Sequence, residues 1–252
     1  AAVCNAGGFG VSGMTEYTPE QMRDEIRRIR ELTSQPFGVD LAIPAGQADV
    51  AVSRQEVRDR VKREYPEHWA WVQSLYGEYN LSPLPDQRPH VGLAASFIEE
   101  QVQVVIEEQI PLLAVALGDP AWLVPRLRDA NITILGLAGS LRNALRQKAA
   151  GVDIIVAQGY EAGGHTGSIA SFALIPEVVK AVAPTPVVAA GGIADGGGLV
   201  AALSLGAVGV WCGTAFLFAA ECGIHPSKRQ GLVRGVTEDF IMTRTYTGKP
   251  AR

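Results

Sequence analysis

Three glycine-rich stretches of this sequence contain the residues best suited to do chemistry. The first includes Gly163-Gly164-His165, the second Gly191-Gly192 and the third Gly213-Thr214. Histidine is the side chain best matched to proton transfer near neutral pH, and the two glycines before His165 let a flat ligand approach the backbone. A lone histidine is more often structural, but this location favours His165 as a catalytic acid–base residue.

The second and third stretches have the features of an anion site. Gly191-Gly192 ends an expected strand and Gly196-Gly197-Gly198 begins an expected helix, whose N-terminus carries partial positive charge. Gly213 and Thr214 add another backbone N–H group and a hydroxyl. Because two successive loops share this pattern, we interpret them as a phosphate-binding site that needs no lysine. The alternative is that these glycines only permit tight turns.

The elements that must position these loops alternate regularly between short apolar strands and amphipathic helices. Strands that are apolar throughout are typical of a parallel sheet covered on both faces, and active sites in such folds lie at the carboxyl ends of the strands. The expected strands are 9–11 (weak), 37–43, 111–117, 132–137, 153–157, 186–190 and 208–211. All three glycine-rich stretches follow one of these strands.

The number of strands favours a barrel over an open, doubly wound sheet. Seven strands are visible, and no Gly-x-Gly-x-x-Gly sequence follows any of them. We therefore expect an α/β fold, a TIM (β/α)8 barrel whose first strand is missing from the given chain and lies before Ala1. The 252 residues suit one such domain, spanning 1–252.

Residues 53–89 interrupt the alternation with an insertion rich in aromatic side chains. It follows the third strand when the missing first strand is counted, and it contains three of the six tyrosines and two of the four tryptophans. Such an insertion is either a lid over the site or an oligomer contact, with a homodimer as the commonest assembly. The alternative is a helical excursion packed on the outer ring of helices.

Composition excludes several classes of protein. The formal net charge of −4 lacks the basic surplus of nucleic-acid binders. Three cysteines without zinc-like spacing indicate a reduced, cytoplasmic protein with no metal site. Residues 196–220 are uncharged and long enough to span a membrane, but Gly206 and Gly209 divide them into a helix and a strand. We expect no membrane span.

These motifs resemble a known family. Residues 158–167 (QGYEAGGHTG), 189–195 (AAGGIAD) and Gly213-Thr214 look like the nitronate monooxygenase (2-nitropropane dioxygenase) family of FMN-dependent TIM barrels. Related FMN-dependent enoyl-[acyl-carrier-protein] reductases share them. The C-terminal residues 243–252 (TRTYTGKPAR) resemble the monooxygenase-like branch more closely.

The resemblance implies a role for each candidate residue. His165 matches the base that removes the proton alpha to a nitro group, whereas nitronates arrive already deprotonated. The implied FMN contacts are a polar side chain at Gln158, backbone against the flavin at Gly163 and Gly164, and phosphate contacts at Gly191, Gly192, Gly213 and Thr214. Asp40 stands where many members have asparagine, and an ionised aspartate cannot donate a hydrogen bond to the flavin. It is a further candidate contact.

The expected activity is therefore FMN-dependent oxidation of alkyl nitronates, and of nitroalkanes where His165 acts as base, with O2 as the electron acceptor. The partners are then a small-molecule substrate and O2. Two alternatives stay open. One is an FMN- and NADH-dependent enoyl-thioester reductase, and the other is a flavin- or phosphate-binding barrel without this catalysis.

Overall fold

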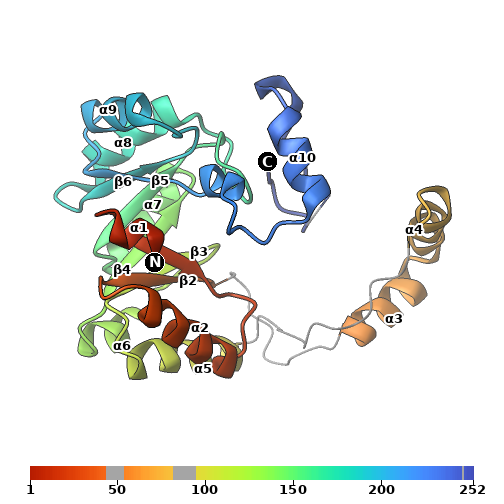
Figure 1. Ribbon diagram of the computed structural model, residues 1–252, viewed down its shortest axis with the longest axis horizontal. Helices are drawn as coiled ribbons and strands as arrows, with labels where there is room; N and C mark the ends of the chain where they lie inside the picture. Colours follow the sequence, from red (N-terminus) through yellow and green to blue (C-terminus); the bar gives the residue numbers. More distant parts are fainter. Residues whose placement is uncertain (44–53, 82–94, 246) are drawn as a thin grey trace.

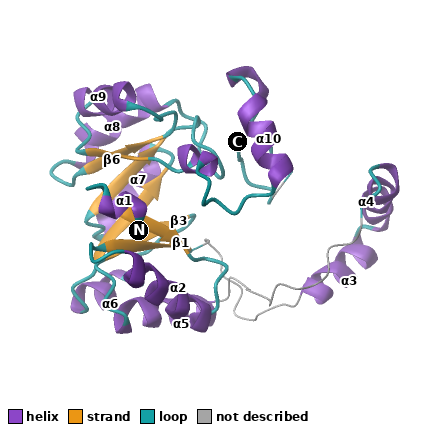
Figure 2. Ribbon diagram, viewed as in Figure 1, coloured by secondary structure: helices purple, strands orange, loops and turns teal. Residues whose placement is uncertain are grey.

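A curled parallel sheet of seven strands forms the centre of the computed structural model, which describes residues 1–43, 54–81, 95–245 and 247–252 (Figures 1 and 2). The strands lie side by side in the order of the sequence, and every neighbouring pair is parallel. Their bounds are β1 (Gly10–Gly13), β2 (Phe37–Ala42), β3 (Leu112–Ala116), β4 (Thr133–Ala138), β5 (Ile154–Gln158), β6 (Val187–Ala190) and β7 (Gly209–Trp211). This confirms the α/β fold with a parallel sheet.

The two outer strands of this sheet are β1 and β7. Each pairs with one strand among the described residues, so the sheet is open between them. An eighth strand would close the sheet into a complete barrel. The expected strand before Ala1 stays a prediction.

Helices cover the outer face of the sheet (Figure 2). Around the sheet lie α1 (Ala2–Asn5), α2 (Pro19–Leu32), α5 (Ala95–Glu107), α6 (Val124–Asp129), α7 (Leu141–Ala150), α8 (Ser171–Val182) and α9 (Gly196–Ser204). Helix α2 begins at a capping box: the Thr18 hydroxyl accepts from Gln21 N–H, and the Gln21 side chain accepts from Thr18 N–H.

The side chains of each strand alternate between two apolar layers. The outer layer, between sheet and helices, includes Val39 and Leu41 of β2 packed with Met22 of α2 and Val102 of α5. A second layer lines the inside of the curl and comprises Leu112, Ala114, Leu135, Val156 and Ala190, with Val11, Leu137, Ile154, Val188 and Trp211 packed against it. This alternation decides which strand residues face the site.

Part of the aromatic insertion is described, namely α3 (Arg54–Glu64) and α4 (Pro66–Glu78), which pack on each other and project away from the sheet (Figure 1). None of the residues of α4 is buried. Trp71 is 57% exposed, and the Lys62 ammonium lies 4.9 Å from the ring centre of Trp69. Among the described residues, α4 projects away from the outer ring of helices and does not pack on it (Figure 1). The lid and the homodimer contact stay predictions, and residue 53 and residues 82–89 of the insertion lie outside the described residues.

The uncharged stretch 196–220 is a helix followed by a strand, as expected. It forms α9, β7 and the short 3-10 helix η1 (Thr214–Phe218). The described residues contain no helix with the length and hydropathy to cross a membrane. Beyond it come α10 (Pro226–Arg234), the short η2 (Thr237–Asp239) and the C-terminal tail.

The loop after β1 is held by one buried amide. Gln101 of α5 is 1% exposed, and its Nε2 lies 3.2 Å from the carbonyl oxygen of Met14, 3.1 Å from that of Thr15 and 2.9 Å from that of Tyr17. The Thr15 hydroxyl in turn accepts from the N–H of Ala42, at the end of β2. The Gln101 side chain thus holds the loop after β1 at the carboxyl edge of the sheet.

We expect the variant Gln101→Leu to lose about 1–3 kcal/mol of unfolding free energy, because buried carbonyls lose their donor while the side-chain volume is retained. Urea unfolding followed by circular dichroism measures the loss. Glu100→Leu, on the same helix but exposed, is the control and should change stability by about 0.5 kcal/mol or less. Equal losses in the two variants would contradict the anchoring role of Gln101.

Candidate functional site

The candidate residues gather at one edge of the sheet because all seven strands are parallel. Residues 159–167 follow β5, residues 191–195 follow β6 and residues 212–214 follow β7. Neighbouring strands share their register, with Gln158 opposite Ala190 and Ala190 opposite Trp211. The three stretches therefore begin side by side at the carboxyl ends of adjacent strands, which confirms their predicted placement.

Backbone N–H groups without partners cluster in two of these loops. Among the described residues, the N–H groups of Gly191, Gly192, Gly213 and Thr214 donate no hydrogen bond. Gly191 and Gly192 have φ angles of +101° and +72°, which L side chains rarely adopt. Since unpaired N–H groups stabilise negative charge, this arrangement fits the predicted phosphate site.

Two predicted residues from different loops are in direct contact. A Cβ added to Gly163 would collide with the hydroxyl oxygen of Thr214. The absence of a side chain at Gly163 is what lets the loop after β5 approach the loop after β7. The structure thereby brings the two halves of the predicted flavin site together.

The N-terminus of α9 contributes less than the sequence suggests. The Asp195 carboxylate caps this helix and accepts the N–H of Gly198 at 2.9 Å, which takes that N–H group out of the anion site. A carboxylate at a helix N-terminus also offsets the positive end of the helix dipole. The unpaired N–H groups of the 191–192 and 213–214 loops therefore remain the main anion donors.

Glu161 lies in the loop of His165, but its carboxylate is already bonded. It accepts from the backbone N–H of Ser171, at the start of α8, and from the Ser171 hydroxyl at 2.7 Å. The Ser171 Oγ also lies 3.0 Å from the Gly191 carbonyl oxygen. Through Ser171, Glu161 therefore helps to hold the start of α8 next to the 191–192 turn. The sequence did not indicate this role.

The C-terminal tail pairs with the loop of His165. Gly164 N–H donates to the Arg252 carbonyl at 2.9 Å, Arg252 N–H returns a bond to the Gly164 carbonyl at 3.0 Å, and Thr166 N–H donates to Pro250 at 3.2 Å. This short antiparallel ladder brings Thr247 to His165, with 2.7 Å between Oγ1 and Nε2. The resemblance of the tail was the only signal of its importance, and no spacing pattern predicted the contact.

The two remaining candidates line the inside of the curl. Gln158 is the last residue of β5, and its side chain makes no hydrogen bond with any described residue. Asp40 of β2 is partly buried, and its Oδ1 atom is fully buried without a partner. Burial raises the pKa of the Asp40 carboxyl to about 6. Neither side chain is hydrogen-bonded to His165, so the structure places them near the same edge but not in one bonded cluster.

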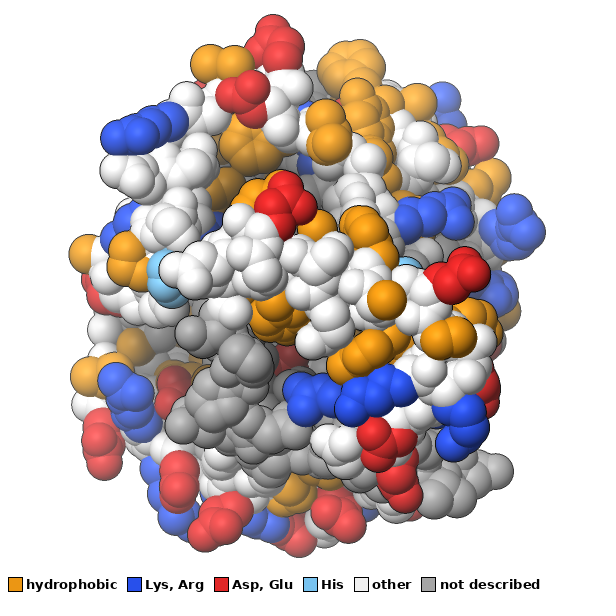
Figure 3. Space-filling model, turned by 90° about the vertical axis from the view of Figure 1, so that its right-hand side faces the viewer, with side chains coloured by type: hydrophobic (Ala, Val, Ile, Leu, Met, Phe, Trp, Pro, Cys, Tyr) orange, Lys and Arg blue, Asp and Glu red, His pale blue; other side chains and the backbone are white. Residues whose placement is uncertain are grey.

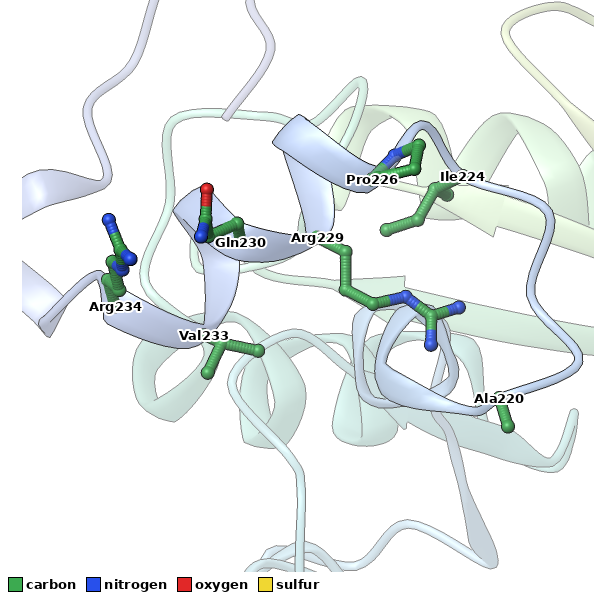
Figure 4. A pocket seen from close by; sticks show the side chains of 7 residues that line it. All are labelled: Ala220, Ile224, Pro226, Arg229, Gln230, Val233 and Arg234. Atoms are coloured by element: carbon green, nitrogen blue, oxygen red, sulfur yellow. The ribbon is translucent and has the colours of Figure 1, made fainter.

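A separate hollow of about 630 Å³ lies between α10 and the segment before it (Figure 4). Arg229 points into it and donates to the carbonyls of Ala219 and Cys222, so its donors already have partners. None of the predicted site residues lines this hollow, whose walls are Ala220, Ile224, Pro226, Arg229, Gln230, Val233 and Arg234.

On the face that Figure 3 shows, apolar side chains are scattered among charged ones.

Comparison with known proteins gives matches along the whole chain. A family model described as nitronate monooxygenase matches residues 1–252. A Mycobacterium tuberculosis protein named as a monooxygenase, Rv1533, is 40% identical and is matched over 100% of this chain and 69% of its own length.

Solved structures agree with that match. A nitroalkane oxidase from Streptomyces ansochromogenes has a TM-score of 0.81 at 32% identity, over 100% of this chain and 70% of that one. FabK from Thermotoga maritima has a TM-score of 0.74 at 29% identity, over 100% of this chain and 64% of that one. The chain thus spans less than two thirds of FabK and slightly more of the other two proteins.

The contact between Glu161 and Ser171 makes a double-mutant test possible. We expect Ser171→Ala and Glu161→Gln each to lose about 1–2 kcal/mol of unfolding free energy, and the double variant to lose clearly less than the sum. Urea unfolding measures all three variants. Ser168→Ala, an exposed serine in the same segment, serves as the control. Additive losses would show that the two side chains do not stabilise the site through each other.

Proposed function

Because the chain belongs to the nitronate monooxygenase family along its whole length, we propose that it oxidises alkyl nitronates with O2, and nitroalkanes where His165 first removes a proton. The family and its solved neighbours are FMN-dependent flavoenzymes, so FMN is the cofactor that this chain uses. The observation that carries the proposal is the set of unpaired N–H groups beside His165 at the carboxyl edge of the sheet.

The described residues fit a flavin mononucleotide. Its phosphate would bind the N–H groups of Gly191, Gly192, Gly213 and Thr214, together with the Thr214 hydroxyl. Its ring system would lie against the bare backbone of Gly163 and Gly164. The side chains of Gln158 and Asp40, both on the inner face of the sheet, complete the set of contacts that we propose.

When bound, FMN would supply the redox chemistry by passing electrons from the substrate to O2. The protein holds the substrate near a base and keeps water away. We assign that base to His165. If Nε2–H donates to Thr247, the other ring nitrogen, Nδ1, carries the free lone pair and accepts the proton alpha to the nitro group. Thr247 is then a positioning residue for the imidazole.

A nitronate has already lost the proton from the carbon next to nitrogen, so it needs no base. The base therefore matters for the neutral nitroalkane and little for the anion, and this difference separates the role of His165 in catalysis from any role in binding FMN. A lid or homodimer contact formed by α4, and a cytoplasmic location, stay predictions.

The enoyl-thioester reductase is the second candidate, and it shares every flavin contact proposed above. An anaerobic titration distinguishes the two activities through the absorption spectrum of the flavin. Bleaching by ethylnitronate, but not by NADH alone, supports the monooxygenase. Bleaching by NADH and reoxidation by an enoyl thioester would support the reductase instead. A protein that binds FMN and reacts with neither would be the non-catalytic barrel.

We expect Thr214→Val to weaken FMN binding by about 10- to 100-fold, because a hydroxyl bonded to a charged group contributes about 1.5–3 kcal/mol. Quenching of flavin fluorescence during titration of the apoprotein measures the dissociation constant. Riboflavin, which lacks the phosphate, is the internal control and should bind both proteins equally. Equal losses for the two flavins would remove Thr214 from the phosphate site.

We expect His165→Ala to lower kcat/KM for 2-nitropropane by about 10²- to 10⁴-fold, the usual contribution of a general base. The loss with preformed propyl-2-nitronate should be much smaller. Oxygen consumption measures both rates, with FMN content checked in each preparation. His68→Ala, on the projecting α4, is the matched control. If both substrates lost activity equally, His165 would not be the base.

A further inference from the structure

One ionisable side chain lies on the inner face of the seven described strands. The register places Asp40 between Gly13 of β1 and Ala114 of β3, and the same row continues to Leu135 of β4 and Ile154 of β5. The other inward positions of these strands carry glycine, apolar side chains, or the uncharged Thr133 and Gln158. A carboxylate at this position therefore has no counter-ion on the sheet.

Ionisable groups on the surrounding elements do not offset that burial. Burial is the cause of the raised pKa of Asp40, and no neighbouring charge contributes to it. The described ionisable side chains at the same edge of the sheet lie in the loops and the tail: Glu16 and Tyr17 after β1, Asp119 after β3, Tyr160, Glu161 and His165 after β5, Asp195 after β6, Cys212 after β7, and Arg252 of the tail. The buried Oδ1 atom of Asp40 has no hydrogen-bond partner among the described residues.

The unpaired Oδ1 atom has a direct chemical consequence. A buried polar atom without a partner is unfavourable, and a buried ionised carboxylate without a partner is more so. A neutral carboxyl can donate one hydrogen bond, whereas an ionised carboxylate can only accept. The flavin ring system carries carbonyl oxygens and unprotonated ring nitrogens, which are acceptors, and one ring N–H group, which is a donor. An ionised Asp40 could pair only with that N–H group and would stay buried without a counter-ion, whereas a neutral Asp40 can donate to the acceptors.

We propose that Asp40 binds the flavin as a neutral carboxylic acid that donates a hydrogen bond to the ring system, so that flavin binding takes up a proton and weakens as the pH rises. This inference rests on the proposed FMN site. It assigns Asp40 the donor role that an asparagine amide could also fill. The affinity for FMN then depends on pH through Asp40, a residue that does not contact the phosphate.

The direction of the effect follows from the two states of the carboxyl. In the apoprotein the pKa of Asp40 is about 6, so the neutral form is the minor one at pH 7 and above. If only the neutral form binds well, FMN affinity falls by up to about tenfold per pH unit above pH 7. The fall ends where the pH reaches the pKa of Asp40 in the complex.

The test measures FMN binding to the apoprotein between pH 7 and 8.5 by flavin fluorescence, a readout that needs no turnover. The FMN phosphate also titrates near pH 6, so riboflavin is titrated in parallel as a ligand without that group. We expect the wild-type dissociation constant to rise up to about tenfold per pH unit for both flavins. Asp40→Asn, which keeps a donor but cannot ionise, should give a pH-independent constant. Asp40→Ala should also be pH-independent but should bind more weakly than Asp40→Asn.

Proton uptake gives an independent measurement. Calorimetric titrations of FMN at pH 8 in two buffers of different ionisation enthalpy should show close to one proton taken up by the wild type and none by Asp40→Asn. Identical pH dependence in wild type and Asp40→Asn, or no proton uptake, would overturn the role of Asp40 alone. Failure of wild type and Asp40→Asn to bind either flavin would overturn the proposed FMN site, and this inference with it.

Urea unfolding of the apoprotein checks that the variants fold. It also measures how ionisation of the Asp40 carboxyl changes stability in the absence of flavin. The pKa of Asp40 is raised on folding, so the contribution of this carboxyl to native stability should fall as the pH rises from about 4 to 6 and should then level off. We expect Asp40→Asn to unfold at a higher urea concentration than wild type at pH 8, by a margin that narrows as the pH falls toward 4. Equal midpoints at all pH values would contradict a buried, unpaired Asp40.

Discussion

The parallel alignment of the strands is the constraint on which the rest of the structure depends. Because side chains alternate along each strand, one set faces the helices and the other lines the curl, and both layers are apolar. Parallel strands also bring every carboxyl end to one edge. Residues more than 170 positions apart in the sequence, such as Asp40 and Thr214, thereby come to the same side of the molecule.

Several polar groups without partners lie at that edge. The Gln101 amide satisfies the carbonyls of the loop after β1, and Ser171 satisfies Glu161 and the turn beside it. In contrast, the N–H groups of Gly191, Gly192 and Thr214 and the Oδ1 of Asp40 remain unpaired among the described residues. Since a folded chain normally pairs such groups, their gathering at one place is what a binding site for a polar, ring-containing ligand requires.

Local sequence patterns predicted the fold well where local physics decides it. Local residues set the ends of helix α7, Leu141–Ala150, because Ser140 caps its start and Gly151, at φ +87°, ends it. The buried strands were recognisable as apolar runs bounded by proline or glycine. The Asp195 cap, the Ser171 contact of Glu161 and the ladder of the tail were not predicted, because each depends on side-chain geometry or on residues distant in sequence. Thr247 and His165 are 82 positions apart.

In the pairing of the tail with the loop of His165, backbone bonds hold the tail in place and a side chain of the tail contacts the imidazole. The ladder joins Gly164 and Thr166 to Arg252 and Pro250 through backbone groups alone, so it holds the tail whatever side chains the tail carries. The side chain at position 247 can therefore differ without moving the backbone that presents it to the imidazole. Arg252 adds its guanidinium 5.8 Å from the ring centre of Tyr160, which strengthens the same contact. The C-terminal sequence can therefore change the group that contacts the proposed base, His165, without altering the glycine loops that we propose for the flavin phosphate.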